Sequence, residues 1–276
     1  WILSQPLNRG RKISALKNFF SWQIGIIFLR KKIIFPWVAN SQFIALKGDT
    51  GMTGNLYAGL AEFDEMGFLL HALRSKMQFI DVGANIGSYT ILASKVLQAK
   101  TFAFEPHPVT FEKLKDQLHI NRIQDLVTAH NCGVGSQNQI LKLTNELDTT
   151  NHIVFSGDSF NCIDVEIVGL DDILVLSSEA ILKVDVEGFE YYVLEGAKKM
   201  LSSEFLIAII IELNGSGHKF GQSDSLIDRE IKSNGFYPVS YDPLTRTVTT
   251  RGDLVNQSVG NVIYIKKIEY IQALCK

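Results

Sequence analysis

A short turn between an apolar run and a helix-like pattern carries residues suited to holding a small molecule. In the stretch FIDVGANIGSYTILAS, residues 79–94, this turn contains Gly83, Asn85 and Gly87. Backbone amides and the positive end of a helix at such a turn attract a phosphate, a ribose or a carboxylate. Glycine lets the backbone approach a ligand closely, and Asn tolerates a left-handed conformation. We therefore expect a binding site at this turn.

The spacing of the glycines separates the candidate ligands. A dinucleotide-binding turn has the pattern G-x-G-x-x-G, but counting from Gly83 places Asn85 and Ser88 at its second and third glycines. A phosphate-binding P-loop ends in Gly-Lys followed by Ser or Thr, which this turn lacks. A nicotinamide-dependent oxidoreductase is therefore disfavoured, although it stays an alternative.

A carboxylate follows the next predicted strand. Glu105 lies 22 residues after Gly83 and ends an apolar run in the sequence FAFEP. A carboxylate offers two acceptor oxygens, which suit the diol of a ribose. Nicotinamide and S-adenosylmethionine enzymes both use an acid in this way, so Glu105 alone does not distinguish them. An exposed acid beside a helix N-terminus is the alternative interpretation.

A third group of charged residues lies in ILKVDVEGFEYYVLEGA, residues 181–197. Lys183, Asp185 and Glu187 alternate along the end of a buried strand, so their side chains project to one side. Charged groups are rarely buried without a partner or a purpose. The structural alternative is an ion pair of Lys183 with one carboxylate, next to a helix that opens at Gly188.

These and two later residues are candidates for a general base. Asp185 and Glu187 are followed by Glu212, which ends the apolar run FLIAIIIEL, and by His218 in a glycine-flanked loop. Burial would raise the pKa of Glu212 toward the working range of a base, and histidine titrates near neutral pH. Asp185 has the alternative role of binding a cofactor ammonium group, and an exposed loop position is the alternative for His218.

The elements that position these residues alternate from about residue 77 onward. Short β-rich runs and helical patterns follow one another, which is typical of a parallel α/β sheet whose ligands bind at the carboxyl ends of the strands. The polar stretch 144–164 is predicted to be a functional loop or lid. The predicted strands are residues 79–82, 100–104, 126–131, 180–186, 205–213, 236–241 and 261–266, and the predicted helices cover residues 86–97, a segment opening at Pro108, a segment burying Phe189, Val193, Ala197 and Leu201, and residues 226–234.

Composition excludes several classes of protein. The 276 residues are 46% hydrophobic and 20% charged, as in ordinary globular proteins. A net charge of -2 disfavours a nucleic-acid partner. Cys132, Cys162 and Cys275 lack C-x-x-C spacing, which favours a reducing, cytoplasmic compartment and no metal knuckle. No metal is predicted, although carboxylates converging at strand ends leave Mg²⁺ or Mn²⁺ open.

The N-terminal region differs from the rest of the chain in composition and sequence pattern. We expect an extension or cap over residues 1–75, helical or irregular, and one domain over residues 76–276. The apolar stretch 22–38 is interrupted by Arg30, Lys31 and Lys32, so no membrane-spanning segment is predicted. Packing on the main domain is favoured for this basic, aromatic region, and peripheral membrane contact is the alternative. A chain that starts at Trp1 leaves a removed targeting peptide open.

Five segments of the sequence together indicate one protein family, although each segment alone is a weak signal. They are GNLYAGLAEFDEMGFLLHAL, FIDVGANIGSYTILAS, AFEPHPVTFEKL, LKVDVEGFEYYVLEGA and IIIELNGSGHKFG, in this order. From about residue 48 onward the chain resembles the FkbM family of S-adenosylmethionine-dependent methyltransferases. The resemblance implies a seven-stranded, doubly wound Rossmann-like sheet and transfer of a methyl group to a hydroxyl, often of a sugar, a glycan or a glycosylated metabolite.

The resemblance also assigns residues to the cofactor. It places Glu105 at the ribose and Glu62 at the mouth of the pocket. The alternative interpretation is that Glu62 and Glu65 form a solvated acidic face of a helix. A non-catalytic S-adenosylmethionine-binding module stays an alternative, and the oligomeric state is open. The expected cofactor-binding residues are Asp81, Gly83, Asn85 and Gly87 near the methionine part, Glu105 at the ribose, Asn131 or Cys132 near the adenine, and also Ala84, Ser88, Pro106 and Asp185.

Overall fold

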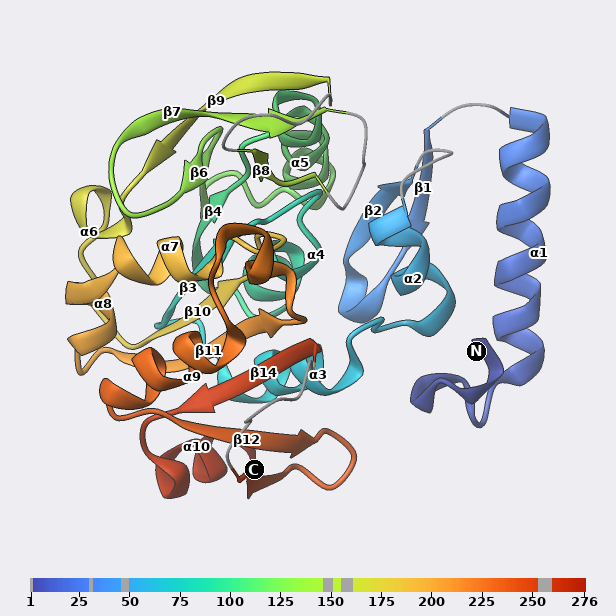
Figure 1. Cartoon of the computed structure of the whole chain (residues 1–276). Helices are drawn as coiled ribbons and strands as arrows, with labels where there is room; N and C mark the ends of the chain where they lie inside the picture. Colours follow the sequence, from blue (N-terminus) through green and yellow to red (C-terminus); the bar gives the residue numbers. More distant parts are fainter. Residues whose placement is uncertain (1, 30–31, 46–49, 146–150, 155–160, 253–259) are drawn as a thin grey trace.

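The computed structural model describes the whole chain except residues 1, 30–31, 46–49, 146–150, 155–160 and 253–259 (Figure 1). Within this part, one large sheet forms the centre of the molecule, and a four-stranded sheet and a two-stranded hairpin lie beside it. None of the helices described has both the length and the apolar content needed to cross a bilayer.

The central sheet is eight-stranded and mixed. Its order is β13-β12-β14-β11-β10-β3-β4-β5, and the five strands from β11 to β5 are parallel. This arrangement confirms the predicted α/β methyltransferase fold: all seven predicted strands are present, and β13 adds an edge. The strands are β3 (Gln78–Val82), β4 (Lys100–Phe104), β5 (Val127–His130), β10 (Ala180–Val184), β11 (Leu206–Leu213), β12 (Tyr237–Asp242), β13 (Thr247–Thr250) and β14 (Gly260–Ile265).

Helices cover both faces of this sheet. Alternate residues of each buried strand face opposite sides, so β10 contributes Leu182 to one core cluster and Ile181 to the other. The first cluster includes residues of α7 (Glu190–Glu195), α8 (Lys198–Ser202) and α9 (Asp224–Ser233), and the second includes residues of α3 (Phe63–Ala72) and α10 (Ile268–Cys275). Further helices are α4 (Ser88–Ile91), a π-helical turn at Leu92–Val96, α5 (Pro108–Asn121) and α6 (Leu170–Ile173).

A second sheet differs from the sequence prediction. Part of the predicted loop 144–164 is strand, because β7 (Gln139–Thr144), β8 (Ile153–Val154) and β9 (Cys162–Val168) pair antiparallel, with β6 (Gly133–Val134) beside β9. Residues 146–150 and 155–160 of that loop lie outside the described part. The helix predicted from residue 86 begins at Ser88 because residues 83–87 form the turn itself.

The N-terminal region was predicted to be helical or irregular, but it also contains an antiparallel hairpin of β1 and β2. It packs on α5 through β2. The backbone amides of Gln42 and Ile44 donate to the side-chain oxygens of Asn121 and Gln117, both at 2.8 Å. The domain boundary expected near residue 75 stays a prediction. The helix α3, which precedes that residue, contributes side chains to a core cluster of the central sheet. The elements here are η1 (Ile2–Ser4), η2 (Pro6–Asn8), α1 (Lys12–Leu29), β1 (Ile33–Pro36), η3 (Val38–Asn40), β2 (Gln42–Ala45) and α2 (Thr50–Ala58).

Candidate active site

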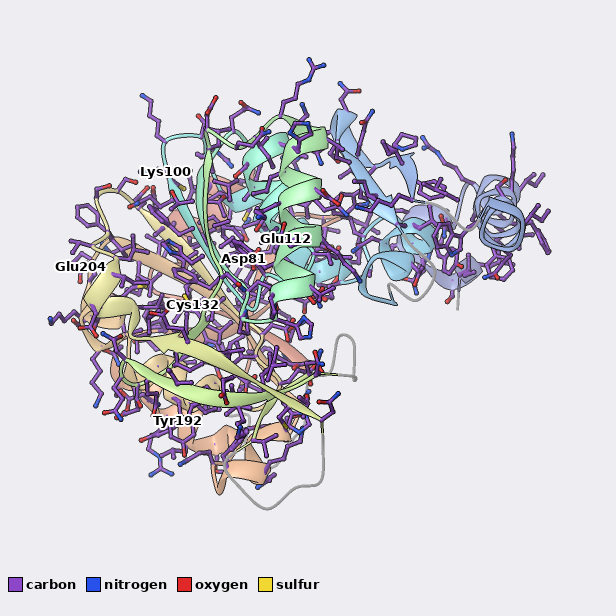
Figure 2. All side chains as sticks on the ribbon, turned by 90° about the horizontal axis from the view of Figure 1, so that it is seen from above. Asp81, Lys100, Glu112, Cys132, Tyr192 and Glu204 are labelled. Carbon is purple, nitrogen blue, oxygen red and sulfur yellow. The ribbon has the colours of Figure 1, made fainter. Side chains whose placement is uncertain are left out.

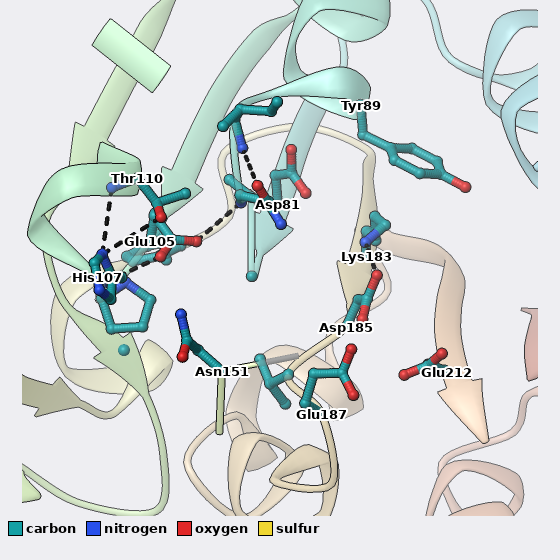
Figure 3. Close-up of a pocket in the computed structure, with 18 of the residues that line it drawn as sticks. Asp81, Tyr89, Glu105, His107, Thr110, Asn151, Lys183, Asp185, Glu187 and Glu212 are labelled. Carbon is teal, nitrogen blue, oxygen red and sulfur yellow. Dashed lines mark hydrogen bonds and ion pairs between the residues drawn. The ribbon is translucent and has the colours of Figure 1, made fainter. Parts of the chain in front are cut away.

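A cavity of about 460 Å³ opens at the carboxyl ends of the parallel strands (Figure 3). Its walls come from the turn after β3, the ends of β4, β10 and β11, the segment before α3, and the edge of the second sheet. Many of the polar side chains in these walls are acidic, and they include Glu62, Asp81, Glu105, Glu187 and Glu212. The cavity therefore suits a ligand with a positive charge and several hydrogen-bond donors.

The glycine turn has the left-handed conformations that its sequence predicts. The φ angles of Gly83, Asn85 and Gly87 are 77°, 51° and 94°. The structure adds a different reason for Gly83: a Cβ atom there would lie 1.8 Å from the carbonyl oxygen of Asp185. At Gly87 a Cβ atom would lie 2.6 Å from Leu114 of α5. Gly83 is thus required by close packing against a backbone carbonyl, whereas Gly87 is favoured by its φ angle, since the end of the Leu114 side chain can move.

Glu105 lies at the carboxyl end of β4 with its carboxylate facing the glycine turn. Its two oxygens accept the backbone amides of Asn85 and His107, both at 2.9 Å, and the residue is 7% exposed. Burial raises the pKa of Glu105 to about 7, and the charges of Asp81 and Asp185 add to the rise. Because a carboxylate has about four acceptor positions, two remain for a ribose diol.

Asp81 and Lys183 form the buried floor of the cavity. One oxygen of Asp81 accepts the hydroxyl of Thr90 at 2.6 Å, while the other is buried without a partner among the described atoms. The ammonium group of Lys183 contacts Asp185 at 2.9 Å and lies 4.8 Å from the ring centroid of Tyr89. Burial alone would lower the pKa of Lys183, but Asp185, Asp81 and Glu62 outweigh it and raise that pKa. Lys183 therefore stays cationic.

Glu62 joins a hydrogen-bond network that sequence reasoning missed in part. Its Oε2 accepts the hydroxyl of Tyr89 at 2.5 Å and the side-chain amide of Asn261 at 2.9 Å. Burial raises the pKa of Glu62, and Lys183 opposes that rise. Neither Tyr89 nor Asn261 carried a signal in the sequence, since they lie 27 and 199 residues from Glu62.

Three carboxylates meet at one side of the cavity. Asp185, Glu187 and Glu212 each offer an oxygen, and these oxygens lie within 4.8 Å of one another (Figure 3). Burial raises the pKa of Glu212 to about 8, with further contributions from Asp185, Glu187 and Glu190. Burial and Asp185 also raise the pKa of Glu187. We call Asp185, Glu187 and Glu212 the carboxylate cluster.

Glu187 is held in an uncommon backbone conformation. Its φ angle is 54°, in the left-handed region that non-glycine residues rarely adopt, and Gly188 follows with 106°. The turn is stabilised by Glu190, whose carboxylate accepts the amides of Val186 and Gly188 at 3.2 and 3.0 Å. Strain of this kind collects at functional sites. In this turn the carboxylate of Glu187 lies near those of Asp185 and Glu212.

The structure does not bring every predicted site residue to the cavity. Asp81, Ala84, Ser88, Pro106 and the carboxylate cluster line it, whereas Gly87, Asn131, Cys132 and His218 do not. Asn131 donates to the carbonyls of Glu105 and Pro106 at 2.9 and 3.1 Å, and Cys132 is buried in a core cluster. His218 is exposed on η6 (Ser216–Phe220). Their adenine and base roles stay predictions.

Two lining residues of the second sheet were not predicted individually. Asn151 and His152 precede β8 and line the cavity. The prediction of a functional loop over residues 144–164 covered them without naming them. Their position depends on the pairing of β7 with β8, a contact between strands that no local pattern shows.

The residues present fit S-adenosylmethionine, the cofactor that the resemblance implies. The unpartnered oxygen of Asp81 provides an acceptor at the glycine turn, and Glu105 keeps acceptor positions for ribose hydroxyls. The acidic walls match a cofactor that carries a sulfonium and an ammonium group. When bound, the cofactor supplies an electrophilic methyl group.

Comparisons with known proteins agree with this assignment. The family model of the methyltransferase FkbM domain matches residues 81–238, which is more than half of the chain. Methyltransferase 1 of Beauveria bassiana is 28% identical over 182 residues, covering 57% of this chain and 71% of that protein. The hexuronic acid methyltransferase AglP of Haloferax volcanii is 30% identical over 156 residues, covering 54% of this chain and 62% of that protein.

A solved structure of similar fold is the methyltransferase FkbM from Methylobacillus flagellatus. It is 17% identical with a TM-score of 0.49, and the alignment covers 79% of this chain but 55% of that one. The chain therefore spans little more than half the length of that protein. From the match over residues 81–238, the chain belongs to the FkbM family of S-adenosylmethionine-dependent methyltransferases.

Proposed function

We propose that the protein transfers the methyl group of S-adenosylmethionine to a hydroxyl oxygen of a sugar, a glycan or a glycosylated metabolite. The carboxylate cluster is the main support for this proposal, because its three oxygens lie within 4.8 Å of one another in the cavity that the glycine turn also lines. An alcohol is a poor nucleophile, and a carboxylate in hydrogen-bond reach can accept its proton as the methyl group is transferred.

The charge of the cavity favours a hydroxyl acceptor over a carboxylate acceptor. A hydroxyl of the acceptor can donate a hydrogen bond to Glu187 or Glu212. A carboxylate of the acceptor would instead be repelled by the negative charges of the cluster. Lys183 does not offset this, since its ammonium group already contacts Asp185. The name of AglP supports a carbohydrate acceptor in general, and the cluster supports a neutral one in this chain.

Cofactor binding is the first expected result. S-adenosylmethionine and its demethylated product should each raise the melting temperature, because a ligand that binds the native state alone stabilises it by mass action. NADH should leave it unchanged. Thermal unfolding with each ligand checks this, and a shift with NADH alone would favour the oxidoreductase alternative.

The acceptor is tested by screening with cofactor labelled in its methyl group. Neutral hexosides and the matching hexuronic acids should be compared, and label is expected in the neutral hexosides as an ether. Label in a uronic acid as a base-labile methyl ester would contradict the hydroxyl assignment. A protein that binds the cofactor but labels no acceptor would favour the non-catalytic alternative.

We further propose a cytoplasmic location, which its three unpaired cysteines favour.

Glu105 provides a prediction specific to the ribose. Glu105→Gln should weaken cofactor binding by about 1.5 to 3 kcal/mol, which is about tenfold to 150-fold in Kd, since charged hydrogen bonds are lost. The amide keeps one oxygen for a backbone amide, whereas alanine would leave the amides of Asn85 and His107 both unpaired. Calorimetric titration measures the effect.

The control for Glu105 is Glu112→Gln on α5. Glu112 pairs with Lys115 on the helix surface, with 68% of its side chain exposed, and should leave the Kd unchanged. Because the pKa of Glu105 is about 7, the affinity of the native protein should increase as pH rises through neutrality. The Gln variant should lose this dependence. An equal Kd for both variants would remove Glu105 from the ribose site.

A further inference from the structure

The N-terminal helix α1 has two apolar faces, and the protein covers one of them. Ala15 and Trp22 lie on the covered face, where they are 3% and 2% exposed. Phe19 contacts Tyr57 of α2 and Trp22 contacts Phe35 of β1, each with ring centroids 5.3 Å apart. This face accounts for the packing of α1 on the rest of the extension.

The opposite face of α1 is an exposed apolar stripe. Ile13, Leu16, Phe20 and Ile24 are 86%, 38%, 57% and 55% exposed. Their spacing of three or four residues places them on one side of the helix. In Figures 1 and 2, α1 lies at the outer edge of the molecule, away from the central sheet. Contiguous exposed apolar surface of this kind marks an interaction site.

The charges around this stripe indicate what covers it. All 29 acidic residues lie at Asp49 or beyond, while the first 48 residues contain eight of the 27 basic ones. Arg9, Arg11, Lys12 and Lys17 are exposed at and near the start of α1. No ion pair between them and a described carboxylate is present. An apolar stripe bordered by cations matches a surface with an anionic face and an apolar interior.

We propose that α1 lies in the interface of an anionic lipid membrane. Its apolar stripe would insert between the acyl chains, while the cations at its N-terminal end contact the lipid phosphates. The helix connects this surface to the cavity, because α2 packs on α1 and carries Asn55, which lines the cavity and donates to Ser88 at 3.2 Å. The proposal does not depend on the chemistry of methyl transfer.

The test measures cosedimentation of the full chain with two kinds of vesicle. Binding is expected to vesicles of phosphatidylcholine and phosphatidylserine, in a ratio of about three to one, and to fall as salt screens the lipid charge. Binding to phosphatidylcholine alone should be much weaker. Equal binding to both vesicles, or to neither, overturns the proposal.

Two variants test the stripe and the cations. Phe20→Glu with Ile24→Glu should weaken binding about tenfold or more, since burial of two large apolar side chains is lost and two carboxylates face the anionic lipid. Arg9→Gln, Arg11→Gln and Lys12→Gln together should weaken it by about fivefold for each cation. The matched control is Ile140→Glu with Val175→Glu, at positions 72% and 85% exposed on the methyltransferase domain, and it should bind like the native chain.

The other candidate occupant of the stripe is a second copy of the chain. Sedimentation velocity without vesicles distinguishes it from a membrane. A monomer that binds the mixed vesicles through α1 supports the proposal. A dimer that Phe20→Glu with Ile24→Glu dissociates, and that does not bind vesicles, overturns it. Because the basic triple variant keeps every apolar contact of α1, the proposal stays testable if the Glu variant fails to fold.

Discussion

Replacing Glu187 with glutamine is expected to lower turnover by about 100-fold or more while leaving the affinity for S-adenosylmethionine unchanged. We propose Glu187 as the general base because its left-handed backbone, with a φ of 54°, aims its side chain toward the other carboxylates of the cluster. Glutamine has nearly the same shape but cannot accept a proton. Single-turnover kinetics and calorimetric titration separate the two effects.

Glu212 is the second candidate, and pH dependence helps to distinguish it. Its pKa of about 8 means that a large fraction is protonated at neutral pH. A base must be ionised, so turnover should rise with pH as Glu212 and Glu187 lose their protons. If Glu212→Gln lowers turnover more than Glu187→Gln, and also abolishes this rise, the order of the two candidates is reversed.

The controls for the base lie outside the cavity. Glu204→Gln removes a carboxylate that is 80% exposed and pairs with Lys267, and should leave turnover unchanged. His218→Ala removes the third candidate, which is exposed on η6. If Glu187→Gln, Glu212→Gln and His218→Ala all keep near-native turnover, none of these three residues is the general base. Asp185, or alignment of the acceptor with the methyl group, would then account for the catalysis.

The strands of the central sheet were predictable because each is a short buried run bounded by turn residues. β11 and β10 are buried along almost their whole length, so their apolar sequences contain the signal themselves. Glu105 and the carboxylate cluster followed from this, since residues after parallel strands meet at one edge of the sheet. The prediction therefore extended from the fold to part of the site.

The remaining parts of the site depend on contacts between distant residues. Strand β8 has only two residues and exists through pairing with β7, so its sequence alone predicts a loop. The contacts of Tyr89 and Asn261 with Glu62 depend on how α3 and β14 pack, and no local spacing reveals them. The role of Gly83 is similar, because the carbonyl that it must accommodate belongs to Asp185.

Replacing Lys183 with methionine is expected to destabilise the protein by about 3 to 5 kcal/mol, because it leaves buried carboxylates without their cation. Lys183 is 3% exposed, and its ammonium group contacts Asp185 at 2.9 Å and interacts with the charges of Asp81 and Glu62. Methionine has a similar length and fills the same space, so lost packing contributes little. Denaturation in urea measures the free energy of unfolding.

The pH dependence of this loss identifies its cause. The partners of Lys183 raise its pKa, so the stabilisation is present at neutral pH and is lost only as pH rises through that elevated value. Burial raises the pKa of Asp81, so in the Met variant this carboxylate can become neutral by taking up a proton, and the loss should shrink as pH falls from 8 toward 5. Lys142→Met is the matched control: its ion pair with Asp164 is exposed and should contribute at most about 1 kcal/mol. A loss at Lys183 that matched this control, or that did not change with pH, would show that the buried cation does not hold the carboxylates of the site together.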